Sequence, residues 1–148
     1  MYHSEVTIEI GRPPDEVFAV LSNLDRHVEW QDGIIEAGWT SETTAAVGAT
    51  YRFVTRFAGS RMDLPGEVTG WDPPHGWTWK GHGGPFPVQG GFRLAGARGR
   101  TRVTMFSDSQ PTGWMNAIRP IMKWIGERGY RWSLARLKTL LESGPGTR

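Results

Sequence analysis

Few residues in this sequence can act as an acid, a base or a nucleophile and also have apolar neighbours in the sequence. The 148 residues include no Cys, which excludes thiol nucleophiles, disulfides and cysteine-based metal sites. The candidates for general acid–base catalysis are Tyr51, Glu67 and His82, because burial can shift the pKa of such groups toward the working pH. Asp63 and Gln89 are further polar groups in the same part of the chain. An ordinary surface or hydrogen-bonded role is the alternative for each of the five.

The common cofactor sites have no counterpart in the pattern. Two glycine-rich stretches, at residues 81–84 and 90–91, neither match G-x-x-x-x-G-K-[ST] nor precede a helical pattern, and no G-x-S-x-G elbow occurs. We therefore expect no metal and no cofactor. Gly90 and Gly91 lie inside a strand pattern, where they predict sharp curvature or room for a ligand. The histidines, none of which shows a close ligand spacing such as His-x-x-x-His, are His3, His27, His75 and His82.

Aromatic side chains are the other unusual feature, with eight Trp in a chain of this length. Within the strand-like segments they fall on one parity, for example Tyr51 and Phe53 opposite Arg52, so one face of the sheet is apolar and must be covered. These side chains are either core packing or the wall of a ligand cavity. The predicted cavity residues are Trp30, Trp39, Tyr51, Phe53, Phe57, Trp77, Trp79, Phe86 and Phe92, with Trp114, Ile118 and Met122 from the last helix.

The elements that position these residues follow from periodicity and turn residues. Pro13, Pro14, Asp15 and Glu16 are typical of a helix start, and a second short helix is expected over residues 25–30. A break at residues 64–66, Leu-Pro-Gly, predicts a bulge or sharp bend. Period-two alternation and turn signals predict antiparallel strands over residues 5–10, 34–40, 49–58, 61–71, 76–81, 86–95 and 101–107.

A long amphipathic helix is expected over about residues 113–142, with Pro120 marking a kink or a new start. The predicted cover of the sheet is an apolar face of this helix, and Tyr130, Leu134, Leu137 and Leu141 form a second, offset stripe. We expect a single domain over residues 1–143 and a flexible tail over residues 144–148. The residues of the predicted covering face are Trp114, Ile118, Ile121, Met122, Ile125 and Trp132.

Charge is distributed unevenly along the chain. Residues 1–97 carry 7 Arg or Lys against 12 Asp or Glu, whereas residues 98–148 carry 10 against 3. A basic last helix can face an anionic membrane or an acidic partner, although it is more often a solvated surface. Nucleic-acid binding is not expected, because the aromatic residues point inward. With no signal-peptide pattern and no stretch of 18 apolar residues, a cytoplasmic location is expected.

The order of elements resembles the START-like, helix-grip superfamily (SRPBCC), and within it the bacterial polyketide cyclase/dehydrase group. The similarity spans nearly the whole chain and marks strand starts and turns rather than a catalytic signature. The matching segments are residues 6–10 (VTIEI), 12–18 (RPPDEVF), Trp30, 48–52 (GATYR), 67–74 (EVTGWDPP) and 99–104 (GRTRVT).

This resemblance implies an α+β fold with a deep cavity between a curved sheet of about seven strands and a long C-terminal helix. Members of the superfamily include carriers, sensors, cyclases and aromatases, so the fold leaves the activity open. The expected function is binding of a lipid-like or polyketide-like molecule, with a cofactor-independent polyketide cyclase, aromatase or dehydratase as the enzyme hypothesis. The alternatives are a non-catalytic carrier or sensor, and an interaction protein that uses the basic helix. A monomer and a homodimer are both compatible with the sequence.

Overall fold

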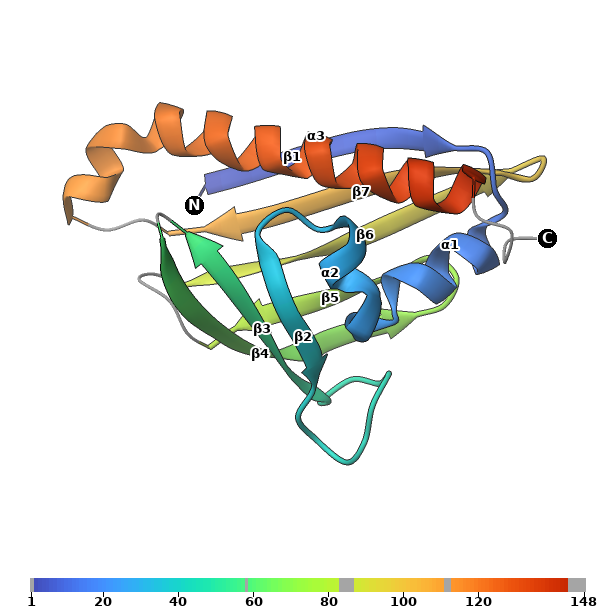
Figure 1. Ribbon diagram of the computed structural model, residues 1–148, viewed down its shortest axis with the longest axis horizontal. Helices are drawn as coiled ribbons and strands as arrows, with labels where there is room; N and C mark the ends of the chain where they lie inside the picture. The colour runs from blue at the N-terminus through green and yellow to red at the C-terminus, as the bar shows by residue number, and fades with distance from the viewer. Residues whose placement is uncertain (1, 58, 83–86, 111–112, 144–148) are drawn as a thin grey trace.

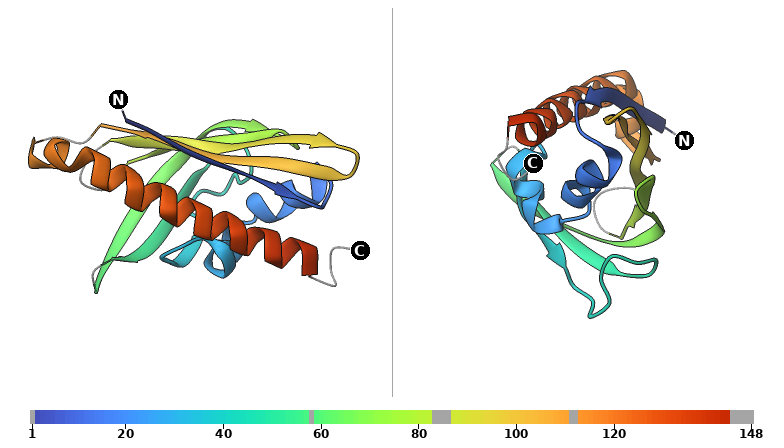
Figure 2. Two further views of the ribbon diagram at one scale, coloured as in Figure 1. Left: turned by 90° about the horizontal axis from the view of Figure 1, so that it is seen from above. Right: turned by 90° about the vertical axis from the view of Figure 1, so that its right-hand side faces the viewer.

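The protein is a seven-stranded antiparallel sheet that curves around short helices, with one long helix across its open side (Figures 1 and 2). The computed structural model describes residues 2–57, 59–82, 87–110 and 113–143. The strands are β1 (Tyr2–Ile10), β2 (Ile34–Trp39), β3 (Thr50–Phe57), β4 (Ser60–Asp72), β5 (Gly76–Gly81), β6 (Val88–Ala97) and β7 (Arg100–Ser109).

The strands follow the order β1-β7-β6-β5-β4-β3-β2 in the sheet. Strands β2 to β7 form a meander, in which each strand pairs with the next one along the chain. Gly59 and Gly99 lie in two of the connecting turns with φ values of 80° and 76°, a left-handed conformation that glycine adopts without strain. Strand β1 instead pairs with β7, so Ile8 lies opposite Val103 at the far end of the sequence.

The helices begin where the sequence predicts them. Helix α1 (Pro14–Leu21) has Pro14 as its first residue and Asp15 and Glu16 in its first turn. The expected second short helix is a 3-10 turn, η1 (Leu24–Arg26), continued by α2 (His27–Trp30). The last segment is a second 3-10 turn, η2 (Gly113–Ile118), followed by α3 (Arg119–Ser143). Pro120 therefore marks a new start, since a proline is tolerated in the first turn of a helix.

The core lies between the concave face of the sheet, the short helices and the C-terminal half of α3. Its fully buried side chains come from each of these layers, among them Val17, Trp30, Val103 and Leu137. Helix α3 packs against β1 and α2, and so it bridges the two edges of the sheet. This arrangement confirms the predicted helix-grip fold, with the sheet left open rather than closed into a barrel. The expected tail at residues 144–148 lies outside the described residues.

The face of α3 that covers the sheet differs from the predicted one. Leu134, Leu137 and Leu141 are fully buried, whereas Trp114, Ile121, Trp124, Ile125 and Trp132 are exposed. The reason is the orientation of the helix: Ile121, Trp124, Ile125 and Trp132 lie on the side opposite Leu134, Leu137 and Leu141, and the inward stripe is the one that begins at Tyr130. The N-terminal part of the helix also extends beyond the end of the sheet (Figure 1).

The bulge expected at residues 64–66 is also wrong. Strand β4 passes through this segment in regular register with β3, with Pro65 opposite Arg52, and the register shift lies at Val68–Gly70 against β5. The Pro65 carbonyl accepts a hydrogen bond from the His82 N–H, just beyond the end of the β4–β5 ladder at Gly66–Gly81. The nitrogen of Pro65, which carries no hydrogen, therefore points toward β5 just beyond the last β4–β5 pair. No ladder hydrogen bond is lost there, and such a position tolerates proline.

Candidate functional site

A pocket of about 230 Å³ lies on the concave side of the sheet. Strands β3 to β7 form its floor, and Tyr130 of α3 and the segment after α2 border it. This volume is below the range usual for drug-sized ligands. The lining residues are Gln31, Asp32, Ile34, Tyr51, Phe53, Thr55, Leu64, Pro65, Trp77, Trp79, Gly81, Val88, Gly91, Phe92, Met105, Phe106 and Tyr130.

Tyr51 is the polar group that stands out in this lining. The residue as a whole is 5% exposed, and no hydrogen bond of its hydroxyl occurs among the described residues. The hydroxyl oxygen itself is not fully enclosed, because the buried side-chain atoms without a partner in the described ranges are Glu16 Oε1 and Trp30 Nε1. Burial raises the pKa of the Tyr51 phenol, and the negative charge of Glu67 raises it further. The hydroxyl therefore stays protonated at physiological pH, and it is available to donate a hydrogen bond to a ligand oxygen.

Glycines allow the aromatic side chains to lie flat against the sheet. A Cβ atom at Gly66 would lie 2.3 Å from the Tyr51 hydroxyl oxygen, so only glycine leaves room for this ring. A Cβ atom at Gly90 would lie 2.8 Å from Cζ2 of Trp79 and 2.4 Å from the Phe106 carbonyl oxygen. Gly90 and Gly91 of β6 thus serve close packing beside the pocket, and Gly91 is itself part of the lining.

Tyr130 contributes a second hydroxyl at the pocket border. This hydroxyl donates a hydrogen bond of 2.6 Å to Oγ of Ser107 on β7, and burial raises the pKa of the phenol. The hydrogen bond ties α3 to the sheet at the pocket, and it leaves the Tyr130 ring facing the lining. Unlike Tyr51, Tyr130 already has a partner within the protein.

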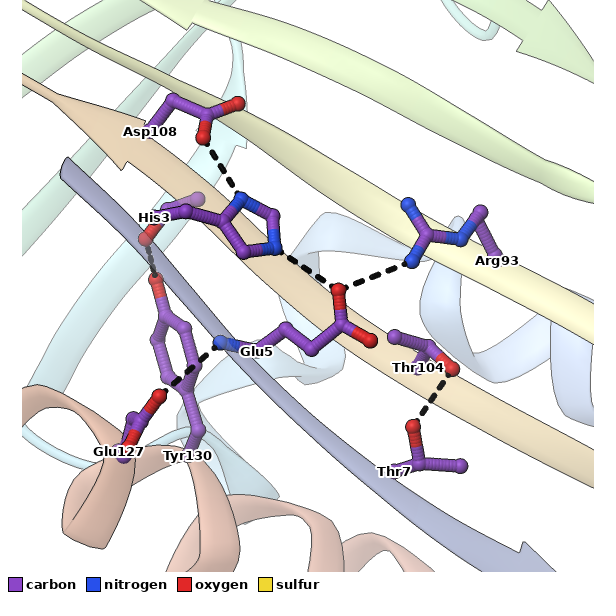
Figure 3. A network of polar contacts seen from close by, with 9 residues as sticks. His3, Glu5, Thr7, Arg93, Thr104, Asp108, Glu127 and Tyr130 are labelled. Carbon is purple, nitrogen blue, oxygen red and sulfur yellow. Dashed lines mark hydrogen bonds and ion pairs between the residues drawn. The ribbon is translucent and has the colours of Figure 1, made fainter. Parts of the chain in front are cut away.

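A polar network on β1, β6 and β7 contacts the N-terminal half of α3 near Tyr130 (Figure 3). The Glu5 N–H donates to a Glu127 carboxylate oxygen at 3.3 Å. His3 lies between Glu5 and Asp108, with ring nitrogen to oxygen distances of 2.8 and 2.7 Å. The hydrogen bond to Glu5 and then the one to Asp108 raise the pKa of His3. The network fixes where α3 crosses β1, next to Tyr130.

His27 is a buried polar residue that the sequence analysis did not select. Nε2 of its ring lies 2.9 Å from the Leu21 carbonyl oxygen, and Nδ1 lies 2.7 Å from the Gln31 side chain. Because a carbonyl only accepts, Nε2 carries the proton. The Gln31 atom nearest Nδ1 is Oε1, so a neutral ring pairs with this amide when the NH2 group is turned toward Nδ1. Complete burial lowers the pKa of His27, which keeps the ring neutral. His27 thereby orients Gln31, which lines the pocket. The i, i+4 spacing of the pair on a helical segment was the available signal.

The structure brings together only part of the predicted cavity set. Trp30 is fully buried in the core beside Phe92, and Trp39 packs against Trp71. Trp114 is 73% exposed on η2, and neither Ile118 nor Met122 lines the pocket. Phe86 and the side chain of Phe57 lie outside what the structure describes. The predicted residues that line the pocket are Tyr51, Phe53, Trp77, Trp79 and Phe92.

The other two catalytic candidates pair with each other away from the pocket. Nε2 of His82 lies 2.8 Å from Oε1 of Glu67, and both side chains are exposed to solvent by more than a third. Glu67 belongs to the outer face of β4, because its neighbours Gly66 and Val68 face inward. Asp63 forms an ion pair with Arg52, also among exposed side chains, and Gln89 is exposed. Only Tyr51 of these polar candidates reaches the pocket.

Within the described ranges, no three His, Asp or Glu side chains come close enough together to hold a metal ion. Asp32 is the one carboxylate among the described lining residues, and it lies at the exposed border of the pocket. The site thus combines an aromatic wall, the Tyr51 hydroxyl and one carboxylate at the border. Such a site can hold an apolar molecule and orient an oxygen atom on it.

A curved sheet, a long helix and an apolar pocket on the concave side define a protein of the helix-grip fold. The family model described as "Polyketide cyclase / dehydrase and lipid transport" matches residues 1–142, and the chain belongs to this family. A comparison with curated proteins gives no match.

Solved structures share the fold at low sequence identity. The protein TTHA0849 from Thermus thermophilus has a TM-score of 0.81 at 16% identity, covering 96% of this chain and 99% of that one. The Zhui aromatase/cyclase from Streptomyces sp. R1128 has a TM-score of 0.76 at 15% identity, covering 93% and 91%. A START superfamily protein from Mycobacterium smegmatis has a TM-score of 0.79 at 12% identity, covering 97% and 99%.

Proposed function

We propose that the protein binds a hydrophobic, ring-bearing small molecule in this pocket, with the Tyr51 hydroxyl donating a hydrogen bond to an oxygen of the ligand. The observation that carries the proposal is Tyr51, a largely buried residue in an aromatic pocket lining whose hydroxyl makes no hydrogen bond to the described residues. A ligand oxygen that pairs with this hydroxyl competes with no partner inside the described protein, so the hydrogen bond adds to affinity. Flat rings suit the side chains of Phe53, Trp77 and Phe92.

A matched pair of probes tests this proposal. Naphthalene and 2-naphthol share one ring system and differ by a single hydroxyl, and the binding of each can be measured by titration calorimetry. The wild type should bind 2-naphthol more tightly than naphthalene, by about 2- to 10-fold for one hydrogen bond. Tyr51→Phe should abolish this difference while naphthalene affinity stays close to that of the wild type.

The outcome against the proposal is equally direct. If Tyr51→Phe keeps the preference for 2-naphthol, the hydroxyl does not hold the ligand oxygen. If neither probe binds, and native mass spectrometry of protein purified from its own host finds no hydrophobic compound, the pocket is not a ligand site. Tyr130→Phe is a useful second variant, since that hydroxyl already pairs with Ser107 and its removal should leave the preference unchanged.

The finer proposal is polyketide cyclisation or dehydration, which the family description and the resemblance to an aromatase/cyclase support. In such a cyclisation a base removes a proton from a carbon next to a carbonyl, and the resulting enolate carbon attacks a second carbonyl carbon. Tyr51 would donate to a carbonyl oxygen as negative charge develops there. Asp32, as the lining carboxylate, would accept the proton.

The enzyme and the carrier predict different consequences for Asp32. In a cyclase, Asp32→Asn should lower turnover of a poly-β-ketone substrate by roughly 100-fold or more, in keeping with the loss of a general base. The affinity for 2-naphthol should change little, because Asp32 lies at the border of the pocket. A carrier would show no turnover in either form, and its probe affinity would still depend on Tyr51.

A further inference from the structure

The N-terminal part of α3 carries a large apolar surface that points away from the core. Its side chains recur every three or four residues, which places them on one face of the helix. Trp124 is 56% exposed and Trp132 is 48% exposed. We call this the outer face of α3, and it consists of Ile121, Trp124, Ile125, Arg128 and Trp132.

This outer face is not a misplaced part of the core. The buried stripe of α3, formed by Leu134, Leu137 and Leu141, lies on the opposite side of the same helix and packs on the sheet. Among the described residues, no element covers the outer face, because its apolar side chains stay about half exposed, and the N-terminal part of the helix extends beyond the sheet (Figure 1). An exposed apolar surface of this kind marks an interaction site more often than chance.

Positive charge surrounds the apolar side chains. The guanidinium of Arg128 lies over the Trp124 ring at 5.4 Å from its centroid, and that of Arg136 lies over Trp132 at 5.0 Å. Arg131 adds a further exposed cation at the edge of the outer face. The one acid in this stretch, Glu127, accepts a hydrogen bond from the β1 backbone at Glu5. The outer face itself therefore carries only positive charge.

The charge decides between the possible occupants. A second copy of the chain would place its arginines against these arginines, which is unfavourable without intervening anions. None of the pockets found among the described residues is lined by the outer face, so it offers no groove for a peptide. An anionic bilayer fits both features, because indole rings favour the membrane–water interface and arginine side chains pair with lipid phosphates.

We propose that the outer face of α3 docks the protein on anionic lipid bilayers, with Trp124 and Trp132 inserted at the interface. The overhanging part of α3 and the β5–β6 end of the sheet lie at the same end of the molecule (Figure 1), and Gly81 and Val88 of the pocket lining belong to that end. If the pocket binds a hydrophobic molecule as proposed above, docking brings its border close to the membrane. This last consequence rests on the proposed function, but the docking does not.

Vesicle flotation of the full chain tests the docking. The protein should float with phosphatidylcholine vesicles that contain phosphatidylglycerol and stay behind with pure phosphatidylcholine, and added salt should weaken the binding. Trp124→Gln/Trp132→Gln should lower the affinity for anionic vesicles at least about tenfold, because indole insertion is lost. Arg128→Glu/Arg131→Glu should lower it by a similar factor or more.

Arg56→Glu/Arg98→Glu is the matched control, since it makes the same change in net charge on β3 and in the β6–β7 turn. It should retain most of the binding, and circular dichroism should show every variant folded. Equal flotation with neutral vesicles, no flotation at all, or equal loss in the control would each overturn the proposal. A dimer in solution that Trp124→Gln/Trp132→Gln dissociates would assign the face to a second copy instead. Tyr51→Phe should leave flotation intact, so failure of the pocket and failure of the docking are distinguishable.

Discussion

A neutral histidine in the core is the clearest residue-scale consequence of this fold. His27 is fully buried, and burial lowers its pKa below the ordinary value of 6.5. Below about pH 6.5 the unfolded chain therefore binds a proton at this position that the folded chain does not bind. By linkage, the free energy of unfolding falls as the pH falls through this range.

This relation gives a pH prediction. Between pH 6.5 and pH 5 the wild type should lose stability with a slope of up to about 1.4 kcal/mol per pH unit from His27. His27→Gln should remove that slope even though the variant is less stable at pH 7, and urea unfolding across the pH range measures both quantities. His75→Gln, which removes an exposed imidazole, should keep the wild-type slope. An unchanged slope in His27→Gln would contradict the prediction.

The sequence predicted the aromatic lining of the candidate site better than its polar groups. The parity of Tyr51, Phe53 and Trp77 within strands places them on the concave face, and they do line the pocket. Glu67 has the opposite parity and so lies on the outer face of β4. It was proposed as a catalytic residue, together with His82, only because its carboxylate can act as an acid or a base. The His27–Gln31 pair was missed because a helical histidine with no metal-ligand spacing carries little signal until its burial is known.

At the scale of elements, strand spacing in the sheet depends on glycines that have no room for a side chain. The Cβ atom of an alanine at position 90 would lie 2.4 Å from the backbone oxygen of Phe106, which cannot move without disturbing β7. Gly126 in α3 is the opposite case, because a Cβ atom there would meet nothing within 4 Å. The two positions therefore form a matched pair.

We expect Gly90→Ala to reduce the free energy of unfolding by about 1–3 kcal/mol, as overpacked sites do. Gly126→Ala should raise it by up to about 1 kcal/mol, since alanine favours the helix over glycine. Thermal and urea unfolding of both variants check the pair. A neutral Gly90→Ala would mean that β6 and β7 adjust at low cost, contrary to the close approach in the structure.

The elements themselves were largely predictable, and the exceptions share a cause. All seven strands and the start of α1 at Pro14 follow from local patterns of turns, alternation and proline. At Pro120 the sequence allowed a kink or a new start, and α3 begins one residue earlier, at Arg119. The covering face of α3 was wrong because residues 113–132 have apolar side chains at helical spacing whether or not a sheet lies beneath them. The bulge at Pro65 was expected because local sequence does not show where pairing with a neighbouring strand ends. In the structure, the β4–β5 ladder ends at Gly66 and Gly81, so Pro65 needs no N–H for that ladder.

For the whole molecule, the overhang of α3 predicts an uneven distribution of stability. Residues 133–141 bury their leucines in the core, whereas residues 119–128 bury no large apolar side chain. Local opening should therefore cost less free energy in the first part of the helix than in the second. The two parts belong to one continuous helix, so the difference arises from packing and not from propensity alone.

Hydrogen exchange measured by mass spectrometry can resolve this difference. Amides in residues 123–128 should exchange at least about tenfold faster than those in residues 134–141. Anionic vesicles should slow exchange in the first group only, if the outer face docks as proposed. Uniform protection along α3 in free protein would contradict the picture of an unsupported overhang.

The pairing of β1 with β7 also governs the order in which the chain can fold. Thr7 meets Thr104 across 97 residues of sequence, and the other element packed on β1 is α3, at the C-terminal end. Strands β2 to β7 can assemble from consecutive hairpins, but β1 must wait for a long loop to close. During synthesis β1 leaves the ribosome before β7 and α3, so its alternating valine and isoleucines stay unpaired until both of these elements have been made.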